Sequence, residues 1–534
     1  MSDLQQLPMH GGQVETRPAF VEDWLDSLPY IDFNQTITVL HAALKAGNRV
    51  QMKAGQRMEL VGLYHRPYYY YLDTQIRTGA QHTIQSIEVM QSQVSGMRLV
   101  AAELARACRM AMEETLKHKS LWGQNKQPLQ AILMAIKYLS HALIYNYLEY
   151  ALAPQKAWQE LNFLYQYTLK IDQQNTPVKL IGIDQKKSSS TIEHAYKRML
   201  LVSLADPYHL PFGAIWEIYH QLEDWTDLAV TGPYKDIQDP GGVFVITLDK
   251  DSGPVPLGKF DRKTAGQKHR LLITEKLQVT LAQILEKIEH NKGGTENLKL
   301  SPYYADYLLR IVHKAWGLPQ KRIYPRKAKA GRMNIAHGIN SVHYFLNNGQ
   351  NFIDSRNTTD SGDDAVITDV GFNPVTPSSA SYRKETWNLV DTSSGGIAVT
   401  REGKPESTIR VGDLAGLALD EENYPQESYR AGITRWLLVR QGKIYKMGIQ
   451  LFNQRAYAAS IAGTGNGNGE VQQRAILLGN PSREKDIQVM TNKGFYKPDM
   501  EISITWNNKS LSCKPGNLVE ATTCFEQFEV SVQR

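Results

Sequence analysis

The spacing of apolar residues changes near residue 317 and divides the chain into two kinds of structure. Before that point, apolar residues recur every three or four positions among strong helix formers, as in residues 96–117 (GMRLVAAELARACRMAMEETLK), which is typical of amphipathic helices. After it, short segments alternate apolar and polar residues between Gly, Asn and Pro, which is typical of strands. We therefore predict a multidomain protein with an α-helical domain over residues 1–316 and a linker at 317–321 (GLPQK).

The helical pattern recurs along the first domain. Residues 129–152 (LQAILMAIKYLSHALIYNYLEYAL) are apolar around much of the helix circumference, which predicts a central place in a bundle. Residues 241–251 (GGVFVITLDKD) instead have the pattern of a strand between two turns. Stacked helix pairs of the solenoid type are an alternative that the sequence leaves open. Further helices are expected at 156–171, 190–204, 211–226, 267–290 and 302–316.

The second half has the pattern of antiparallel β-structure. Residues 317–460 are predicted to form a barrel interrupted by a polar insertion at 347–385, and a glycine-rich linker at 461–470 (IAGTGNGNGE) leads to a small C-terminal β-rich unit at 471–534. The segments with strand character are RMNIAHGINSVHYFL (332–346), GGIAVTRE (395–402), TRWLLVRQ (434–441), KIYKMGIQLF (443–452), RAILLG (474–479), DIQVMT (486–491) and EISITW (501–506).

The charge, the cysteine content and the apolar runs of the sequence argue against several classes of protein. A net charge of +6 over 534 residues is small and makes nucleic-acid binding unlikely as the main activity, because such proteins usually carry a concentrated basic stripe. Three cysteines without metal-ligand spacing (Cys108, Cys513 and Cys524) fit a reducing compartment. The N-terminal residues lack the pattern of a signal peptide, and no apolar run is long enough to span a membrane. A cytoplasmic protein without membrane insertion is expected.

Two arginines four residues apart precede the first β-segment. Arg322 and Arg326, with Lys321 beside them, can converge on one anion if the chain turns around it. Each guanidinium offers a planar fork that suits phosphate oxygens, and each can also stack on a purine. Pro325 biases Tyr324 toward extended geometry, which favours a shaped loop over a helix.

A second polar group follows a predicted strand at Asn388–Gly396 (NLVDTSSGG). Asp391 can accept hydrogen bonds from the N1–H and exocyclic amine of a guanine, and Ser393 can donate to a phosphate or cap the turn. Gly395 and Gly396 permit positive φ and allow a ligand to approach the backbone closely.

Together these residues resemble the PilZ domain family, whose signature is RxxxR ahead of a barrel and [DN]xSxxG on an early strand pair. Arg322 and Arg326 match the first half, and Asp391, Ser393 and Gly396 match the second. The two halves are 65 residues apart (391 minus 326), and the 39-residue insertion accounts for the excess. The resemblance implies a six-stranded antiparallel barrel that binds cyclic di-GMP. The arginines would grip phosphate and guanine, and the Asp-x-Ser loop would hold the other base.

The function that this resemblance implies is that of a non-enzymatic second-messenger effector without metal or cofactor. Cyclic di-GMP would order the junction between the helical domain and the barrel. It would thereby regulate motility, type IV pili, biofilm formation or other surface behaviour. The helical domain, which has none of the motif residues, would contact a protein partner. Two alternatives stay open: a ligand-free PilZ-like adaptor acting as a protein-interaction module, and an RNA-associated protein using the basic segment 319–332.

Other polar or aromatic groups have simpler interpretations. The run Tyr68–Tyr71 is expected to pack in a core, and His220 with Asp224 to form a surface pair. The glycines of 461–470 lack the context of a phosphate-binding loop. No nucleophile with a neighbouring base can be identified. The acidic residues Asp360, Asp363, Asp364 and Asp369 lack a calcium-loop pattern and are interpreted as a solvated loop.

Overall fold

The computed structural model forms two compact units that divide between residues 320 and 321, apart from the short segment Tyr208–Pro211. The described residues are 7–79, 84–117, 127–181, 189–290, 293–302, 304–317, 325–352, 382–419, 429–464, 472–479, 487–498, 500–507 and 509–533.

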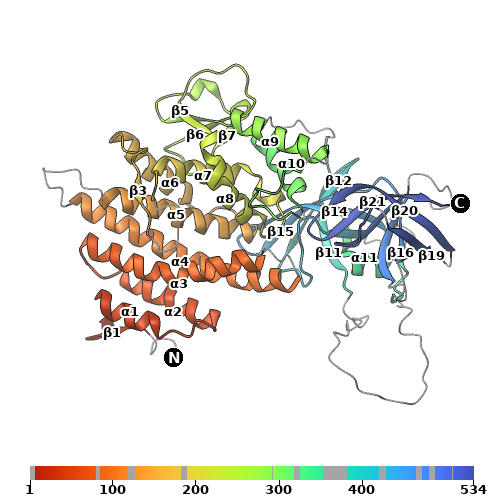
Figure 1. Ribbon diagram of the computed structural model, residues 1–534, viewed down its shortest axis with the longest axis horizontal. Coiled ribbons are helices and arrows are strands. Elements are labelled where there is room, and N and C mark those ends of the chain that lie inside the picture. The colour runs from red at the N-terminus through yellow and green to blue at the C-terminus, as the bar shows by residue number, and fades with distance from the viewer. Residues whose placement is uncertain are drawn as a thin grey trace, which may run out of the picture. The chain divides into compact units, whose positions relative to one another are not determined.

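The first unit is mainly helical (Figure 1), which confirms the predicted fold class of its half of the chain. The expected central helix is α5, and its face of Ile132, Leu133 and Ile136 is completely buried. Its packing partner α4 exceeds the predicted 96–117 segment at its N-terminal end. The helices are α1 (Pro18–Asp26), α2 (Phe33–Gly47), α3 (Ala54–Gly79), α4 (Ile84–Lys117), α5 (Gln127–Leu148), α6 (Ala157–Lys170), α7 (Ile192–Leu204), α8 (Ala214–Trp225), α9 (Glu275–Glu289) and α10 (Ala305–Trp316).

A four-stranded sheet lies within this unit, where the sequence predicted one strand. Its order is β5-β8-β6-β7, and the predicted stretch 241–251 contains β6. The predicted helix at 267–290 was wrong in its first part, because His269–Ile273 is strand β8. This segment pairs with β5 on one side and β6 on the other, so the helix begins only at Glu275. The bounds are β5 (Val230–Pro233), β6 (Val243–Thr247), β7 (Val255–Pro256) and β8 (His269–Ile273).

Two ribbons of two-residue strands also lie in this unit. Strands β1 (Met9–His10) and β2 (Gln13–Val14) pair with each other, as do β3 (Val178–Lys179) and β4 (Ser189–Ser190). None of the described helices combines the length and apolarity that a bilayer span requires.

The second unit begins with an antiparallel barrel. Strand β10 pairs with β11 on one side and β13 on the other, so the order β10-β13-β14-β15-β12-β11 closes on itself, and β9 adds to β11. The expected six-stranded antiparallel barrel is therefore present. Its strands are β9 (Lys327–Ala328), β10 (Arg332–His337), β11 (Glu385–Ser393), β12 (Gly396–Glu402), β13 (Leu414–Leu419), β14 (Arg430–Arg440) and β15 (Ile444–Leu451).

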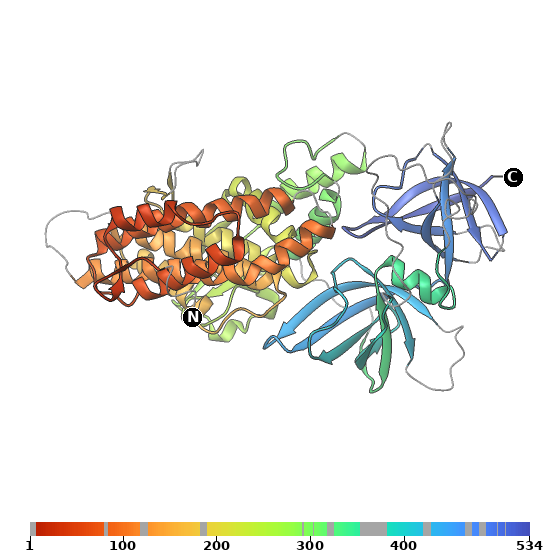
Figure 2. The same ribbon diagram turned by 90° about the horizontal axis from the view of Figure 1, so that it is seen from below.

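The predicted β-segment 332–346 is only half strand, because Ile339–Leu346 forms helix α11. Gly338 ends the strand with a φ of 83°, a conformation that glycine adopts without strain. The spacing of Ile339 and Val342 then places both on one helical face, where they pack with residues of β13, β16 (Ala456–Thr464) and β17 (Gln473–Leu478). Figure 2 shows the short green helix between the two groups of strands that follow residue 321. Ile339 and Val342 are thus core residues of a short helix, whereas Tyr344 and Phe345 are only partly buried.

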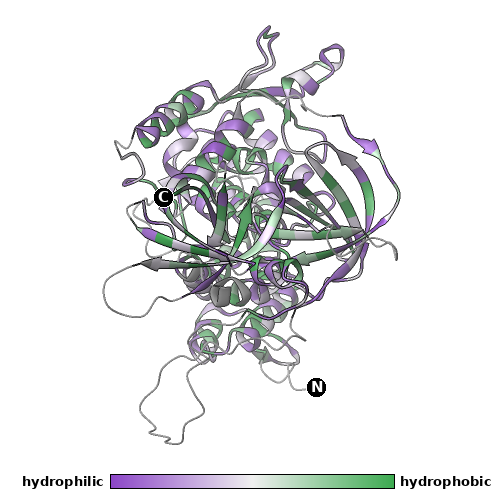
Figure 3. Cartoon of the chain, turned by 90° about the vertical axis from the view of Figure 1, so that its right-hand side faces the viewer, coloured by the Kyte–Doolittle hydropathy of each residue, from purple (hydrophilic) through white to green (hydrophobic). Residues whose placement is uncertain are grey.

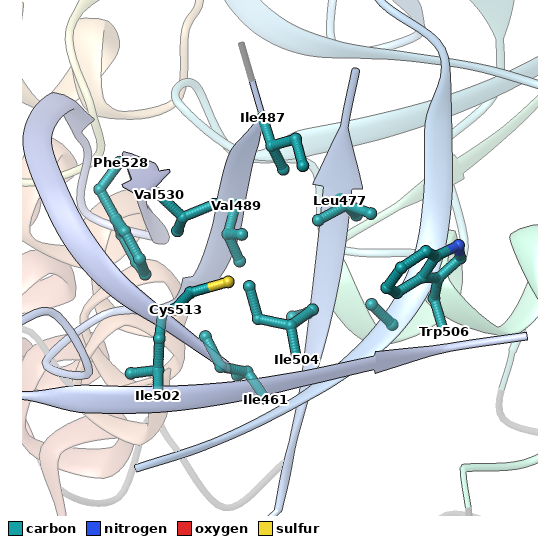
Figure 4. Close-up of a cluster of buried hydrophobic side chains, with 12 residues drawn as sticks. Ile461, Leu477, Ile487, Val489, Ile502, Ile504, Trp506, Cys513, Phe528 and Val530 are labelled. Carbon is teal, nitrogen blue, oxygen red and sulfur yellow. The ribbon is translucent and has the colours of Figure 1, made fainter. Parts of the chain in front are cut away.

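A second closed barrel follows, with the order β16-β17-β18-β21-β20-β19. Apolar and polar residues alternate strictly along β19 (EISITW), and Figure 3 shows hydrophobic and hydrophilic residues next to one another on the strands. Ile461, Val489 and Phe528 point into the interior of this barrel (Figure 4). Its strands are β16 (Ala456–Thr464), β17 (Gln473–Leu478), β18 (Gln488–Asn492), β19 (Glu501–Trp506), β20 (Lys509–Ala521) and β21 (Phe525–Val532).

The linker expected at 461–470 is wrong in its first part, because Ile461–Thr464 belongs to β16 and pairs with β17 and β19. The remainder of that stretch lies outside the described residues. Strand β16 therefore begins at Ala456, which is earlier than the predicted start of the last unit at residue 471. The apolar residues of this strand are interspersed with glycine and alanine, which made it resemble a linker.

Candidate ligand-binding site

The segment that carries Arg326 runs along strand β11. Strand β9 pairs antiparallel with β11 at Ala328↔Asp391 and Lys327↔Thr392. Beyond a short irregularity, β10 continues the pairing at Arg332↔Asn388. The amide of Leu389 donates to the carbonyl of Gly331 across the irregularity at 2.9 Å. The residues that follow the arginine motif are therefore part of the barrel wall.

This register brings Arg326 and Asp391 together. Nη1 of Arg326 lies 3.2 Å from Oδ2 of Asp391, although the residues are 65 positions apart. The side chains are 35% and 22% exposed, so solvent still reaches both. Such a partly exposed pair contributes little to stability, and it leaves a cation and an anion accessible side by side.

Strands β11 and β12 are joined by a tight hairpin in which Ser393 pairs with Gly396. The Ser393 hydroxyl donates to the Gly396 carbonyl at 3.2 Å, which is a turn-capping contact, and its donation to a phosphate stays a prediction. The carbonyl of Gly395 accepts from the amide of Leu451 at 3.1 Å, which attaches the hairpin to β15.

Gly396 is needed for a different reason from the one expected. Its φ is not in the left-handed region, so the positive φ that glycine permits is not adopted at this position. A Cβ at this position would lie 2.6 Å from the carbonyl oxygen of Ile449. The absence of a side chain therefore allows β12 to approach β15, where Gly396 pairs with Gln450.

Asp391 belongs to a row of residues that crosses four strands. Asp391 pairs with Ala398, Ala398 with Gly448, and Gly448 with Trp436, so these four residues share one face of the barrel. The neighbouring row contains buried residues of the barrel interior, among them Val399 and Met447. Because side chains alternate along a strand, the row of Asp391, Ala398, Gly448 and Trp436 (the Asp391 row) faces outward.

Trp436 lies flat across this row. A Cβ on Gly448 would be only 1.9 Å from the indole Nε1, so the half-buried indole occupies the space above the glycine. Neighbouring strands are about 4.8 Å apart, which places Gly448 roughly 10 Å from Asp391. The row thus has a carboxylate at one end, small residues in the middle and an aromatic face at the other end.

Arg435, next to Trp436, is the extra residue of a β-bulge, because the register of β14 and β15 shifts between Thr434 and Trp436. Its Nε donates to Oε1 of Gln450 at 2.8 Å, and Gln450 is the strand partner of Gly396. Arg435 is therefore a second guanidinium, besides that of Arg326, beside the hairpin. Sequence reasoning missed both Arg435 and Trp436, because only the strand register brings them near Asp391.

A pocket of about 680 Å³ opens on the same barrel. Two of its lining residues, Asn388 and Thr400, are strand partners. They occupy the outward-facing position of β11 and β12 that comes next to Asp391 and Ala398. Its buried Glu385 is held by Arg401 and by the amide of Ser407. The pocket lining includes four Arg and Lys side chains, whose positive charges offset the negative charges of its glutamates. The lining residues are Arg332, Arg383, Lys384, Glu385, Thr386, Asn388, Thr400, Arg401, Glu402, Glu406 and Ile444.

Several predicted positions lie outside the described residues. These include Lys321 and Arg322, most of the insertion (353–381) and the acidic residues Asp360–Asp369. In the helical unit, Tyr68 is buried and its hydroxyl lies 3.0 Å from Nδ1 of His141, as expected for a core residue. Asp224 pairs with Lys299 at 2.7 Å. His, Cys, Asp and Glu side chains nowhere gather in metal-binding groups of three within the described parts.

Comparison with known proteins adds two family matches. Residues 19–234 match the N-terminal domain of the cyclic-di-GMP receptor FimW, and residues 243–375 match the middle PilZ domain of that receptor. The second match includes Arg326 but ends before Asp391. The Asp391 hairpin is therefore a candidate part of the site only through its sequence motif and its strand register. The chain is also 20% identical over 493 residues to the cyclic-di-GMP receptor FimW of Pseudomonas aeruginosa. That similarity covers 84% of this chain and 79% of the relative.

Proposed function

Given that this chain is a multidomain protein of the PilZ domain family, we propose that it is a non-enzymatic effector that binds cyclic di-GMP. The ligand site consists of Arg322, Arg326, Asp391, Ser393 and Gly396, with Lys321 and Gly395 beside them. The observation that carries the proposal is the strand register that brings Arg326 to within 3.2 Å of Asp391. The two receptor-type family matches support it.

The chemistry of the pair suits a guanine nucleotide. The Asp391 carboxylate can accept hydrogen bonds from the N1–H and the exocyclic amine of guanine. Arg326 can then leave the carboxylate for a phosphate, because a guanidinium binds phosphate oxygens through two parallel hydrogen bonds. The existing ion pair holds the Asp391 carboxylate in position before the ligand arrives, so little entropy of that side chain is lost on binding.

Trp436 extends the site along the Asp391 row. A guanine whose edge is bound by Asp391 lies above Ala398, and its far side reaches the indole. Stacking of a base on an aromatic side chain is worth about 1–3 kcal/mol. This contact gives the site a preference for a planar purine that a charge pair alone would lack.

The response to the ligand follows from chain connectivity. The motif arginines directly follow the division between the two units at residues 320 and 321, so binding orders the segment that joins them. A ligand that prefers one arrangement of this segment shifts the population of the whole chain toward it. The proposed output, exerted in the cytoplasm through a protein partner of the helical unit, is control of motility, pili or other surface behaviour.

A ligand-free adaptor is the second candidate function, and one observation favours it. Asp391 already has a partner in Arg326, so each charge is balanced by the other without a bound nucleotide. In an adaptor, the barrels would bind a protein partner whether or not cyclic di-GMP is present. A partner interaction that cyclic di-GMP leaves unchanged would favour this function.

Isothermal titration calorimetry with cyclic di-GMP tests the proposal. Arg326→Ala is expected to lose at least about tenfold in affinity, because a charge-assisted hydrogen bond contributes roughly 1.5–3 kcal/mol. Arg440→Ala is the matched control, since it removes the same charge from the exposed end of β14 next to the β14–β15 turn. No heat with the wild-type protein would reject the ligand. Equal loss in both variants would reject the role of Arg326.

A further inference from the structure

The two barrels of the second unit are joined by an ion pair beside the proposed ligand site. Nη1 and Nη2 of Arg435 donate to the two carboxylate oxygens of Glu520, with Nη2 at 2.9 Å from Oε2. Arg435 is in β14 of the first barrel, and Glu520 is in β20 of the second. The side chains are 26% and 19% exposed, so this two-point contact is better shielded from solvent than the Arg326–Asp391 pair.

Both partners lie at irregularities of their strands. Arg435 is the extra residue of the bulge in β14, and the register of β20 shifts between Leu518 and Glu520. Bulges redirect side chains and weaken the local strand pairing. The Arg435–Glu520 bridge therefore joins two places where the strand ladder is already interrupted.

The bridge is connected to the ligand hairpin by a short chain of contacts. Arg435 also binds the side chain of Gln450 at 2.8 Å, and Gln450 pairs directly with Gly396. Trp436, the next residue, is the aromatic end of the Asp391 row. A phosphate held at the hairpin therefore lies within the reach of a guanidinium that Glu520 already occupies.

We propose that Glu520 competes with the phosphate of cyclic di-GMP for Arg435, so that ligand binding releases the end of β20 from the first barrel. This inference rests on the proposed binding of cyclic di-GMP. Glu520 neutralises Arg435 and also repels an anionic ligand, so it opposes binding in two ways. Because coupling between two ligands of one group is reciprocal, a bound nucleotide weakens the contact between the barrels to the same extent.

Other contacts between the two barrels remain when the end of β20 is released. The hydroxyl of Thr522 donates to the carbonyl of Gly412 at 2.9 Å, which ties the residues after β20 to the first barrel a second time. Loss of the Glu520 contact leaves this hydrogen bond and the apolar packing of α11 in place. The second barrel is therefore expected to loosen at β20 without separating from the first.

Affinity measurements on three variants test the competition. Glu520→Gln removes the competing charge and should bind cyclic di-GMP about three- to tenfold more tightly than the wild type, in line with one partly screened charge at this range. Glu501→Gln is the matched control, because Glu501 faces Lys514 within the second barrel. It should bind as the wild type does. In an Arg435→Ala background, Glu520→Gln should have no effect, because the group that the two anions share is gone.

Hydrogen exchange of the wild-type protein tests the release without any substitution. Adding cyclic di-GMP should speed amide exchange in residues 516–522 and leave strand β19 unchanged. Unchanged affinity in Glu520→Gln, or the same gain in the Arg435→Ala background, would overturn the competition. Slower exchange at 516–522 would overturn it as well. Absence of binding by both the wild type and Glu520→Gln would instead reject the proposed function, and the inference with it.

Discussion

The Arg326 guanidinium lies 3.2 Å from the Asp391 carboxylate because β9 pairs with β11 at that position. The two side chains thus form a preassembled pair of opposite charges on the barrel surface. Surface ion pairs of this kind contribute about 0–1 kcal/mol to stability. The pair is therefore expected to contribute little to folding, and the proposed role in binding can be tested separately.

Asp391→Asn separates these two roles. The amide keeps one acceptor but loses the charge and the second oxygen that face a guanine edge, so affinity for cyclic di-GMP should fall about tenfold or more. Stability should change by less than about 1 kcal/mol, since only an exposed pair is lost. Calorimetric titration and urea unfolding of the same preparation give both values. A large loss of stability would show that the pair has a structural role.

Substitutions of Trp436 test the aromatic end of the Asp391 row. Trp436→Ala should weaken cyclic di-GMP binding by about 1–3 kcal/mol, the contribution of one stacked base. Trp436→Phe keeps an aromatic face and should recover a large part of that loss. If both variants bind equally weakly, stacking is not the reason. The comparison is made by titration, after far-UV spectra have shown that both variants are folded.

Gly396→Ala should destabilise the first barrel. The new Cβ would lie 2.6 Å from the carbonyl oxygen of Ile449, so β12 and β15 must move apart, at a cost of about 1–3 kcal/mol. Gly232→Ala is the control, because nothing lies within 4 Å of its Cβ position and its φ is not in the left-handed region. That variant should unfold within about 0.5 kcal/mol of the wild type in urea.

The Asp413 carboxyl group predicts a pH effect on stability. Burial raises the pKa of Asp413 to about 6, against the opposing effects of Arg410 and the Leu414 amide. A pKa that is higher in the folded state than in the unfolded state favours folding while the group is protonated. The contribution is fully present below pH 4 and is lost as pH rises through 6. Asp413→Asn should therefore be more stable than the wild type at pH 7.5, by up to about 3 kcal/mol.

The difference between Asp413→Asn and the wild type should vanish near pH 4. Urea midpoints measured at pH 4 and pH 7.5 provide the check. An equal difference at both values would mean that the amide acts through packing. The amide oxygen can still accept from the Leu414 amide, which lies 2.8 Å from Oδ1 of Asp413, so loss of that hydrogen bond does not complicate the comparison.

The local pattern was sufficient to predict the fold class. Alternation in segments such as EISITW reflects a strand with one buried face, and 129–152 reflects a helix buried on most sides. The local pattern predicted the wrong element where a pairing strand or an adjacent glycine determines the conformation of the segment. His269–Ile273 adjoins a strong helical pattern, but β5 and β6 pair with it on both sides. Ile339–Leu346 has β-formers, but Gly338 ends the strand before them.

The candidate site was predictable only where a motif carries it. Arg326 and Asp391 stand in recognisable spacing within their own segments, and their meeting is now seen in the register of β9 and β11. Arg435 and Trp436 have no motif. Their place beside the hairpin depends on a bulge and on Gly448, whose missing side chain makes room for the indole. Such relations between distant strands cannot be obtained from spacing along the chain.

The pairing of β9 with β11 also has a mechanical consequence. The covalent path from the helical unit enters the barrel through the two residues of β9, which are hydrogen-bonded beside Asp391. A pulling force carried along that path would load this short strand in shear before it reached any other part of the barrel wall. Tension on the chain and occupancy of the site would then act on the same few hydrogen bonds.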